Sequence, residues 1–134
     1  MPLHPTKYAE LLGKKLKENK VNVWLVNTGW SGGSFGVGSR MKLSYTRAMI
    51  TAALEGKLEK IPQETLPIFG LNIPTECEGV PKEIMNPRNT WKDKEAYDAT
   101  ATKLAAAFVK NFEQYASAAN EEIMAAAPKA EVNV

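Results

Sequence analysis

The sequence has one cysteine, one histidine and no apolar run long enough to cross a bilayer. The lone Cys77 excludes an internal disulfide, and the lack of a secretory signal then favours a reducing, cytoplasmic location. We interpret Cys77 as an ordinary packing or loop thiol, because a nucleophilic cysteine needs an activating partner and no histidine lies near it. The lone His4 favours a structural role, because a metal site made of protein groups usually needs several ligands at suitable spacing.

Excess charge of either sign is also missing. The 17 lysines and arginines nearly balance the 15 aspartates and glutamates, and the formal net charge is +2. With neither a basic stripe nor a block of like charge, the composition gives no reason to invoke nucleic acid or a membrane surface as a partner. At 134 residues the chain suffices for one modest domain, and it contains no internal repeat.

Hydrophobic periodicity predicts an α/β (α+β) fold, with about three helices packed on a small mixed sheet. The helices are predicted at residues 5 to about 20, 44–56 and 93–116. Ser44 is the expected N-cap of the second helix and Gly56 its stop. The third helix is the longest and carries an aromatic stripe that we expect in the core. The alanine-rich residues 117–134 are expected to fray or to remain mobile.

The strands are predicted from short apolar runs. Residues 21–26 read VNVWLV, which is almost continuously apolar and suits a strand covered on both faces, as in a parallel or mixed sheet. A short extended piece is expected at residues 40–43. Residues 66–73 are expected to form two short strands joined near Gly70, in a proline-rich region that excludes a long helix.

Glycines crowd the stretch from residue 27 to residue 40, which reads NTGWSGGSFGVGSR. Gly33 and Gly38 are spaced as the two glycines of a P-loop are, but Ser39 stands where that motif requires lysine and Arg40 where it requires Ser or Thr. We therefore interpret the run as a set of turns with positive φ and close backbone approach rather than as a phosphate cradle.

Four blocks of sequence, in this order, resemble the C-terminal part of ATP-dependent phosphoenolpyruvate carboxykinase. They lie within residues 4–10, 27–48, 67–70 and 86–90, and the likeness extends up to about Tyr115. The resemblance implies that residues 1–116 are the C-terminal segment of that enzyme's nucleotide-binding domain, within a larger kinase-like lobe. It also implies that the chain is a piece of a larger enzyme.

In that family the nucleotide is contacted by the arginine that closes the glycine run, by the next residue and by a threonine a few positions later. The matching positions here are Arg40, Met41 and Thr46. Their chemistry suits a planar cation over the base, an adaptable apolar wall and a small hydrogen-bonding group. The residues alone leave a plainer alternative open, in which the arginine is solvated or ion-paired and the threonine is a first-turn helix residue. Ser39 departs from the lysine that is often found before the arginine.

The resembled enzyme converts oxaloacetate and ATP to phosphoenolpyruvate, ADP and carbon dioxide in gluconeogenesis, and typically uses Mg2+ and Mn2+. We assign no catalytic and no metal-binding residue to this chain, because the P-loop and the metal ligands belong to the rest of the enzyme. The implied partners are the remainder of the carboxykinase chain, ATP and oxaloacetate, with no nucleic acid and no membrane. The leading hypothesis is a segment that supplies part of the adenine pocket and is inactive alone. The alternatives are a self-standing non-catalytic module that binds a nucleotide or a protein, and a scaffold without ligand affinity.

Overall fold

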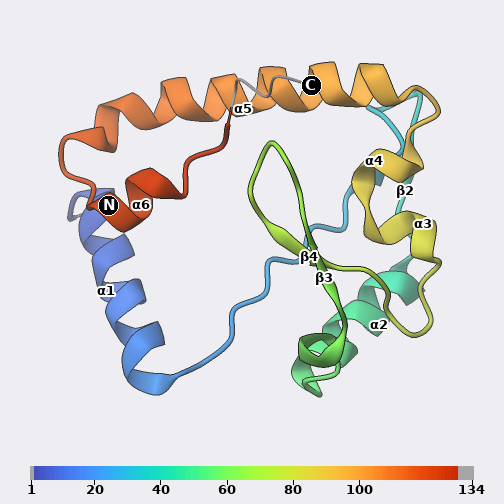
Figure 1. Cartoon of the computed structure of the whole chain (residues 1–134), viewed down its shortest axis with the longest axis horizontal. Coiled ribbons are helices and arrows are strands. Elements are labelled where there is room, and N and C mark those ends of the chain that lie inside the picture. Colours follow the sequence, from blue (N-terminus) through green and yellow to red (C-terminus); the bar gives the residue numbers. More distant parts are fainter. Residues whose placement is uncertain (1, 130–134) are drawn as a thin grey trace.

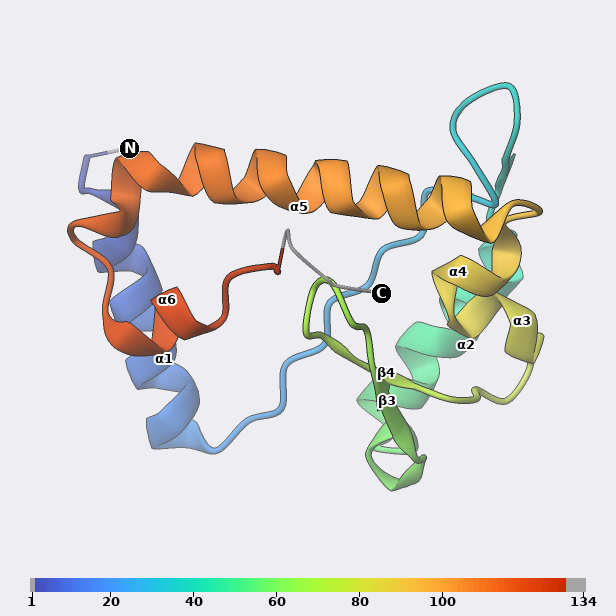
Figure 2. The same ribbon diagram turned by 45° about the horizontal axis from the view of Figure 1, so that its top comes forward.

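The computed structural model describes residues 2–129, and its helices and strands form two groups that the long helix α5 joins (Figures 1 and 2). One group holds α1 and α6, and the other holds α2, α3, α4 and the β3–β4 hairpin. This combination confirms the predicted α+β class. In chain order the elements are α1 (Pro5–Asn19), β1 (Trp30–Ser31), β2 (Ser39–Arg40), α2 (Leu43–Leu54), the 3-10 helix η1 (Leu58–Lys60), β3 (Gln63–Thr65), β4 (Asn72–Pro74), α3 (Lys82–Met85), α4 (Pro87–Thr90), α5 (Lys94–Ala116) and α6 (Glu121–Ala125).

Helix α5 begins and ends where the sequence predicts. Its N-cap is Asp93, whose carboxylate accepts a hydrogen bond of 3.0 Å from the Ala96 N–H. The predicted apolar stripe is only partly buried. Ala101 and Tyr97 pack in a small core with Ile68, whereas Phe108, further along, is 54% exposed. The expectation that the whole stripe is core is therefore wrong, because this small core covers only the beginning of α5.

Helices α1 and α6 and the last turn of α5 lie together at one end of the molecule (Figures 1 and 2). Nδ1 of His4 lies 2.8 Å from the Thr6 hydroxyl, and its ring meets that of Tyr115 edge-on, which fits the structural role expected of this histidine. Lys17 of α1 and Glu122 of α6 form an ion pair of 2.9 Å. Helix α6 thus lies inside the predicted alanine-rich tail. Residues 130–134 of that tail lie outside the described residues, and its mobility stays a prediction.

Helix α2 begins one residue earlier than predicted. Its N-cap is Lys42, whose carbonyl accepts the Thr46 N–H, so the prediction of Ser44 as the cap is wrong. The reason is that Ser44 already has helical backbone, and an N-cap must lie outside the helix. Gly56, with a φ of +68°, follows the helix as predicted. Ala52 packs in the other small core, which consists of Ala52, Leu58, Cys77 and Val80. Cys77 is buried there, which confirms a packing thiol.

The strands of the described chain form two separate antiparallel pairs instead of one mixed sheet. Strand β3 pairs with β4 in the register Gln63↔Pro74, and Gly70 lies in the connecting turn with a φ of +64°. The predicted hairpin near Gly70 is confirmed, although its paired residues lie at and beyond the ends of the predicted range 66–73. Strands β1 and β2 form the second pair, with Trp30 opposite Arg40.

Residues 21–26 are extended but do not form a strand, so that prediction is wrong for this structure. They run between α1 and the glycine hairpin without a ladder partner (Figure 1). The physical reason is that a strand needs a neighbouring edge, and no other segment of residues 2–129 pairs with this one. Apolar side chains of the run, including Val23 and Leu25, are consequently exposed.

Candidate functional site

The glycine run folds as a short hairpin whose loop projects past the beginning of α5 (Figure 2). The N–H groups of Val37 and Gly38 both donate to the Ser34 carbonyl, at 3.0 and 2.9 Å. The Trp30 and Phe35 rings meet edge-on, 5.2 Å apart, and brace the loop against its first strand. These two N–H groups are therefore committed to the loop itself, as expected for turns rather than for a phosphate cradle.

Two glycines of the hairpin allow close backbone contacts. Gly32 has a φ of +82°, and a Cβ at this position would lie 2.9 Å from the Thr90 carbonyl oxygen of α4. At Gly38 a Cβ would clash with the carbonyl oxygens of Gly33 and Ser31. The predicted positive φ and close approach are thus present, and the loop rests directly on the end of α4.

The three residues predicted to contact a nucleotide all lie at the junction of β2 and α2. Arg40 ends β2 and is exposed, and Met41 follows it half-buried, its N–H donating to the Gly29 carbonyl at 3.0 Å. Thr46 is half-buried in the first turn of α2. Among residues 2–129 neither the Arg40 guanidinium nor the Thr46 hydroxyl has a hydrogen-bonding partner, and no hydrogen bond joins one to the other. Both groups are therefore available to a ligand.

The junction carries unbalanced positive charge. Arg40, Lys42 and Arg47 lie within eight residues, and no acidic residue occurs between Ser39 and Leu54. None of the three cations forms an ion pair within the described part of the chain, and the Lys42 ammonium instead lies 5.6 Å from the centre of the Tyr45 ring. The beginning of α2, which has no side-chain cap, adds the positive end of a helix dipole. Such a surface favours an anionic ligand.

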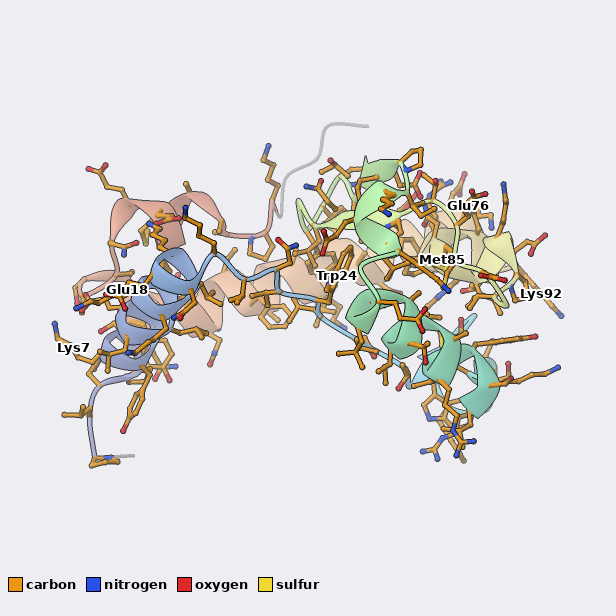
Figure 3. The ribbon with its side chains drawn as sticks, turned by 90° about the horizontal axis from the view of Figure 1, so that it is seen from below. Lys7, Glu18, Trp24, Glu76, Met85 and Lys92 are labelled. Carbon is orange, nitrogen blue, oxygen red and sulfur yellow. The ribbon has the colours of Figure 1, made fainter. Side chains whose placement is uncertain are left out.

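A largely apolar cavity of about 600 Å³ lies beside this junction. Met41 lines it, together with Met49 of α2 and the extended residues Trp24 and Val26. The Trp24 indole N–H is buried and has no hydrogen-bond acceptor in the described structure. Figure 3 labels Trp24 and Met85, which both line the cavity. Of the three predicted residues, Met41 is the one that this cavity contacts.

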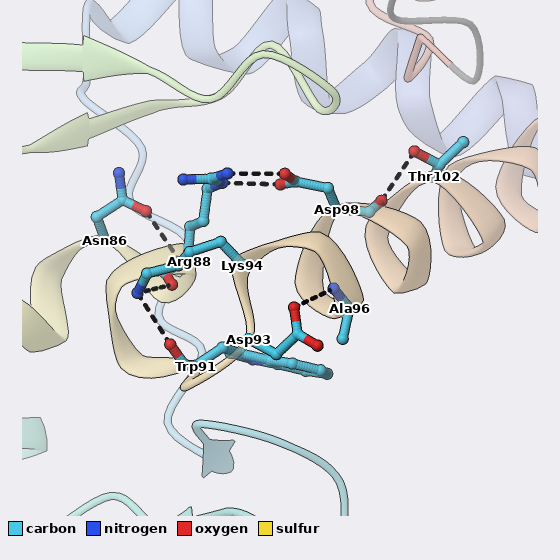
Figure 4. Close-up of polar contacts among 8 residues, drawn as sticks. All are labelled: Asn86, Arg88, Trp91, Asp93, Lys94, Ala96, Asp98 and Thr102. Atoms are coloured by element: carbon cyan, nitrogen blue, oxygen red, sulfur yellow. Dashed lines mark hydrogen bonds and ion pairs between the residues drawn. The ribbon is translucent and has the colours of Figure 1, made fainter. Parts of the chain in front are cut away.

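A polar network fixes the corner between α4 and α5 (Figure 4). Arg88 donates two hydrogen bonds of 2.8 Å, from Nε and Nη2, to the two carboxylate oxygens of Asp98. These bonds hold the pKa of Asp98 below its ordinary value. Lys94 Nζ donates to the Arg88 and Trp91 carbonyls, and Asn86 caps α4 by accepting the Arg88 N–H. Arg88 thus fixes the turn between α4 and α5.

The corner between α4 and α5 supports the glycine hairpin of β1 and β2, because the Thr90 carbonyl that lies against Gly32 belongs to α4. Sequence reasoning missed Asp98 and Lys94 as supporting residues. Asp98 lies ten residues after Arg88, across a helix boundary, and neither helical nor strand periodicity links such positions.

The sequence model of the phosphoenolpyruvate carboxykinase family matches residues 1–83, which is more than half of the chain. The chain belongs to this family. The match includes the glycine hairpin and all three predicted contact residues, but it ends before the polar corner of α4 and α5.

Individual relatives extend the match over almost all of the chain. Proteins called phosphoenolpyruvate carboxykinase (ATP) from Christiangramia forsetii, Flavobacterium johnsoniae and Thermus thermophilus are 64%, 58% and 50% identical to it. These matches cover 96%, 96% and 98% of this chain but 24%, 24% and 25% of the relatives. The chain therefore spans about a quarter of the length of the curated relatives it matches.

No helix in residues 2–129 is long and apolar enough to cross a membrane.

Proposed function

We propose that this chain is the C-terminal segment of a cytoplasmic, ATP-dependent phosphoenolpyruvate carboxykinase and supplies part of its adenine pocket. The parent enzyme would convert oxaloacetate and ATP to phosphoenolpyruvate, ADP and carbon dioxide. The observation that carries the proposal is the β2–α2 junction, where the Arg40 guanidinium and the Thr46 hydroxyl have no hydrogen-bonding partner among residues 2–129 and the apolar Met41 follows Arg40. The names of the relatives, which specify ATP, support the choice of nucleotide.

The junction residues fit the needs of an adenine ring. Affinity for the ring comes from apolar contact and stacking, and its specificity comes from a few hydrogen bonds at the edge. In this proposal the Arg40 plane stacks on the base, Met41 forms an apolar wall and the Thr46 hydroxyl bonds to the ring edge. Lys42 and Arg47 add positive charge, which favours the polyphosphate. When bound, ATP supplies the phosphoryl group that the parent enzyme transfers.

Residues 2–129 do not offer a set of side chains that could bind the divalent metals of the reaction. Among residues 2–129, no three His, Cys, Asp or Glu side chains come together in a way that could hold a metal ion. We therefore assign the Mg2+ and Mn2+ ligands, the P-loop and the oxaloacetate-binding groups to the rest of the parent enzyme. Phosphoryl transfer depends on metal-held phosphates and positioned cations, so the isolated segment is proposed to be inactive.

A chimeric enzyme tests this role. The 128 matching residues of the Christiangramia forsetii relative are replaced by those of this chain, and phosphoenolpyruvate formation is measured as a function of ATP concentration. We expect an active chimera. Arg40→Ala should raise the KM for ATP at least tenfold, as loss of a cation that contacts the base would. Lys60→Ala is the control, because it removes an exposed cation that lies outside the junction, and it should change KM less than threefold.

An inactive chimera, or equal effects of the two substitutions, would contradict the proposal. The alternative of a self-standing nucleotide-binding module makes a different prediction for the isolated chain. If that alternative holds, the 134-residue chain alone binds ATP with magnesium in a calorimetric titration, and Arg40→Ala abolishes the signal. We expect no such binding, because the junction offers one wall of a pocket and its cations are open to solvent.

A further inference from the structure

Helix α4 is too short to fix its own position. It consists of four residues, Pro87–Thr90, and none of them is buried. A single helical turn is not stable through its own hydrogen bonds, and without buried side chains packing does not place it either. The position of its last carbonyl, that of Thr90, therefore depends on polar contacts with the neighbouring elements.

Polar contacts hold α4 from two sides. The Arg88 guanidinium donates two hydrogen bonds of 2.8 Å to the carboxylate of Asp98 in α5 (Figure 4). Lys94 of α5 donates to the Arg88 carbonyl at 2.8 Å. On the other side, the side-chain amide of Asn86 donates to the Glu64 carboxylate of β3, also at 2.8 Å. The bidentate pair is the strongest of these contacts, because it joins two full charges through two parallel hydrogen bonds.

The end of α4 in turn supports the glycine hairpin. The Thr90 carbonyl oxygen lies against Gly32, where a Cβ would come within 2.9 Å of it. Gly32 directly follows β1, and in the β1–β2 ladder Trp30 lies opposite Arg40. A displacement of the Thr90 carbonyl would therefore move Arg40, because a single contact and one short ladder separate them.

Thr46 has a different support. It lies in the first turn of α2, and that helix packs in the small core of Ala52, Leu58, Cys77 and Val80. Among residues 2–129, the apolar residues packed in or against this core include none from α4 or α5. The two polar groups of the β2–α2 junction are thus held separately, and the corner between α4 and α5 supports only that of Arg40.

We propose that Arg88 and Asp98 are positioning residues for the nucleotide site, because their ion pair fixes the end of α4 and thereby, through the glycine hairpin, the position of Arg40. The inference rests on the proposed function, in which Arg40 contacts the adenine. Neither member of the pair touches the nucleotide in this account. Since contact with the base is the same in the ground state and the transition state, loss of the pair should raise the KM for ATP and leave kcat unchanged.

Kinetics of the chimeric enzyme test this role. Asp98→Asn removes the charge but keeps the shape of a side chain that is 33% exposed, so the variant should still fold. We expect the KM for ATP to rise about fivefold, as for loss of one ion pair, with kcat within twofold. Asp98→Glu can still form a bidentate pair and should keep KM within twofold. Glu122→Gln is the control, because it removes an ion pair of 2.9 Å between α1 and α6, and it should change neither constant by twofold.

Double variants show whether the effect passes through Arg40. If it does, Asp98→Asn should raise KM less than twofold in an Arg40→Ala background, where the group to be positioned is gone. In a Thr46→Val background, which lacks the hydroxyl but keeps the shape, the rise should stay near fivefold. Equal factors in the two backgrounds would overturn the proposal, and so would a fall in kcat without a rise in KM.

Amide exchange in the chimera without nucleotide separates this inference from the proposed function. Asp98→Asn should speed exchange of the Met41 N–H, which donates to the Gly29 carbonyl, at least fivefold and leave the Glu55 N–H at the end of α2 unchanged. If exchange responds in this way but Arg40→Ala leaves KM unchanged, the pair positions the hairpin and the adenine-pocket proposal fails. If Arg40→Ala raises KM while Asp98→Asn changes neither exchange nor KM, the proposed function stands and the positioning role is overturned.

Discussion

Gly32 lies where the glycine hairpin rests on α4, and an alanine there should destabilise the chain more than an alanine at Gly36. Both glycines have positive φ, +82° and +90°, so both substitutions cost roughly 1–3 kcal/mol of backbone strain. Only Gly32→Ala also places a methyl group 2.9 Å from the Thr90 carbonyl oxygen, whereas nothing lies within 4 Å of the same atom at Gly36. Forcing atoms into a filled space costs a further 1–3 kcal/mol, roughly.

The difference between the two variants is measured by urea unfolding followed by circular dichroism. We expect the free energy of unfolding to be lower for Gly32→Ala than for Gly36→Ala by about 1 kcal/mol or more. If the hairpin opens locally instead, the Val37 and Gly38 amides, which donate to the Ser34 carbonyl, should lose exchange protection in Gly32→Ala alone. Equal unfolding free energies together with equal exchange would refute the contact between the hairpin and α4.

Three further predictions concern stability and reactivity. Gly13→Ala, inside α1 with nothing within 4 Å of the new methyl group, should stabilise the chain by about 1 kcal/mol in thermal unfolding, and a loss of stability would contradict the helix. Burial raises the pKa of the Cys77 thiol, so iodoacetamide should modify it slowly in the native chain and rapidly in urea; fast native labelling would contradict its place in the core. Arg88 lowers the pKa of Asp98 in the folded state. The stabilisation from this pair should therefore be complete above about pH 4, which is the pKa of an aspartate in the unfolded chain, and it should be lost as the pH falls through the lower pKa of the folded state. Asp98→Asn should flatten that acid limb of the stability profile, and an unchanged profile would exclude the pair.

The helix that local sequence determines most strongly was predicted best. Helix α5 has its cap, Asp93, and its periodicity within one stretch of chain, so no distant residue is needed to place it. The strand predicted at residues 21–26 failed for the opposite reason, because a ladder depends on a second segment that the sequence of this run does not contain. The cap of α2 was misplaced by two residues, since Lys42 begins the helix through its backbone and not through a favoured side chain.

In the candidate site, too, local sequence indicated some features and missed others that depend on contacts between distant segments. An arginine after a glycine run is ambiguous by itself, so Arg40, Met41 and Thr46 were chosen through a family resemblance, and their contact with a nucleotide stays a prediction. The structure adds what spacing could not supply, namely that the Arg40 and Thr46 polar groups are free of partners among residues 2–129. The ion pair of Arg88 with Asp98 was not predicted, because it forms across a corner between two helices.

The central claim is that the β2–α2 junction holds the adenine of ATP in the parent enzyme. Photolabelling of the chimeric enzyme with 8-azidoadenosine triphosphate tests it most directly, because the azide reacts with whatever lies beside the base. We predict that the label within this segment falls on peptides covering residues 40–46 and that excess ATP prevents it. Labelling of other peptides of the segment, or labelling at residues 40–46 that ATP does not displace, would contradict the account.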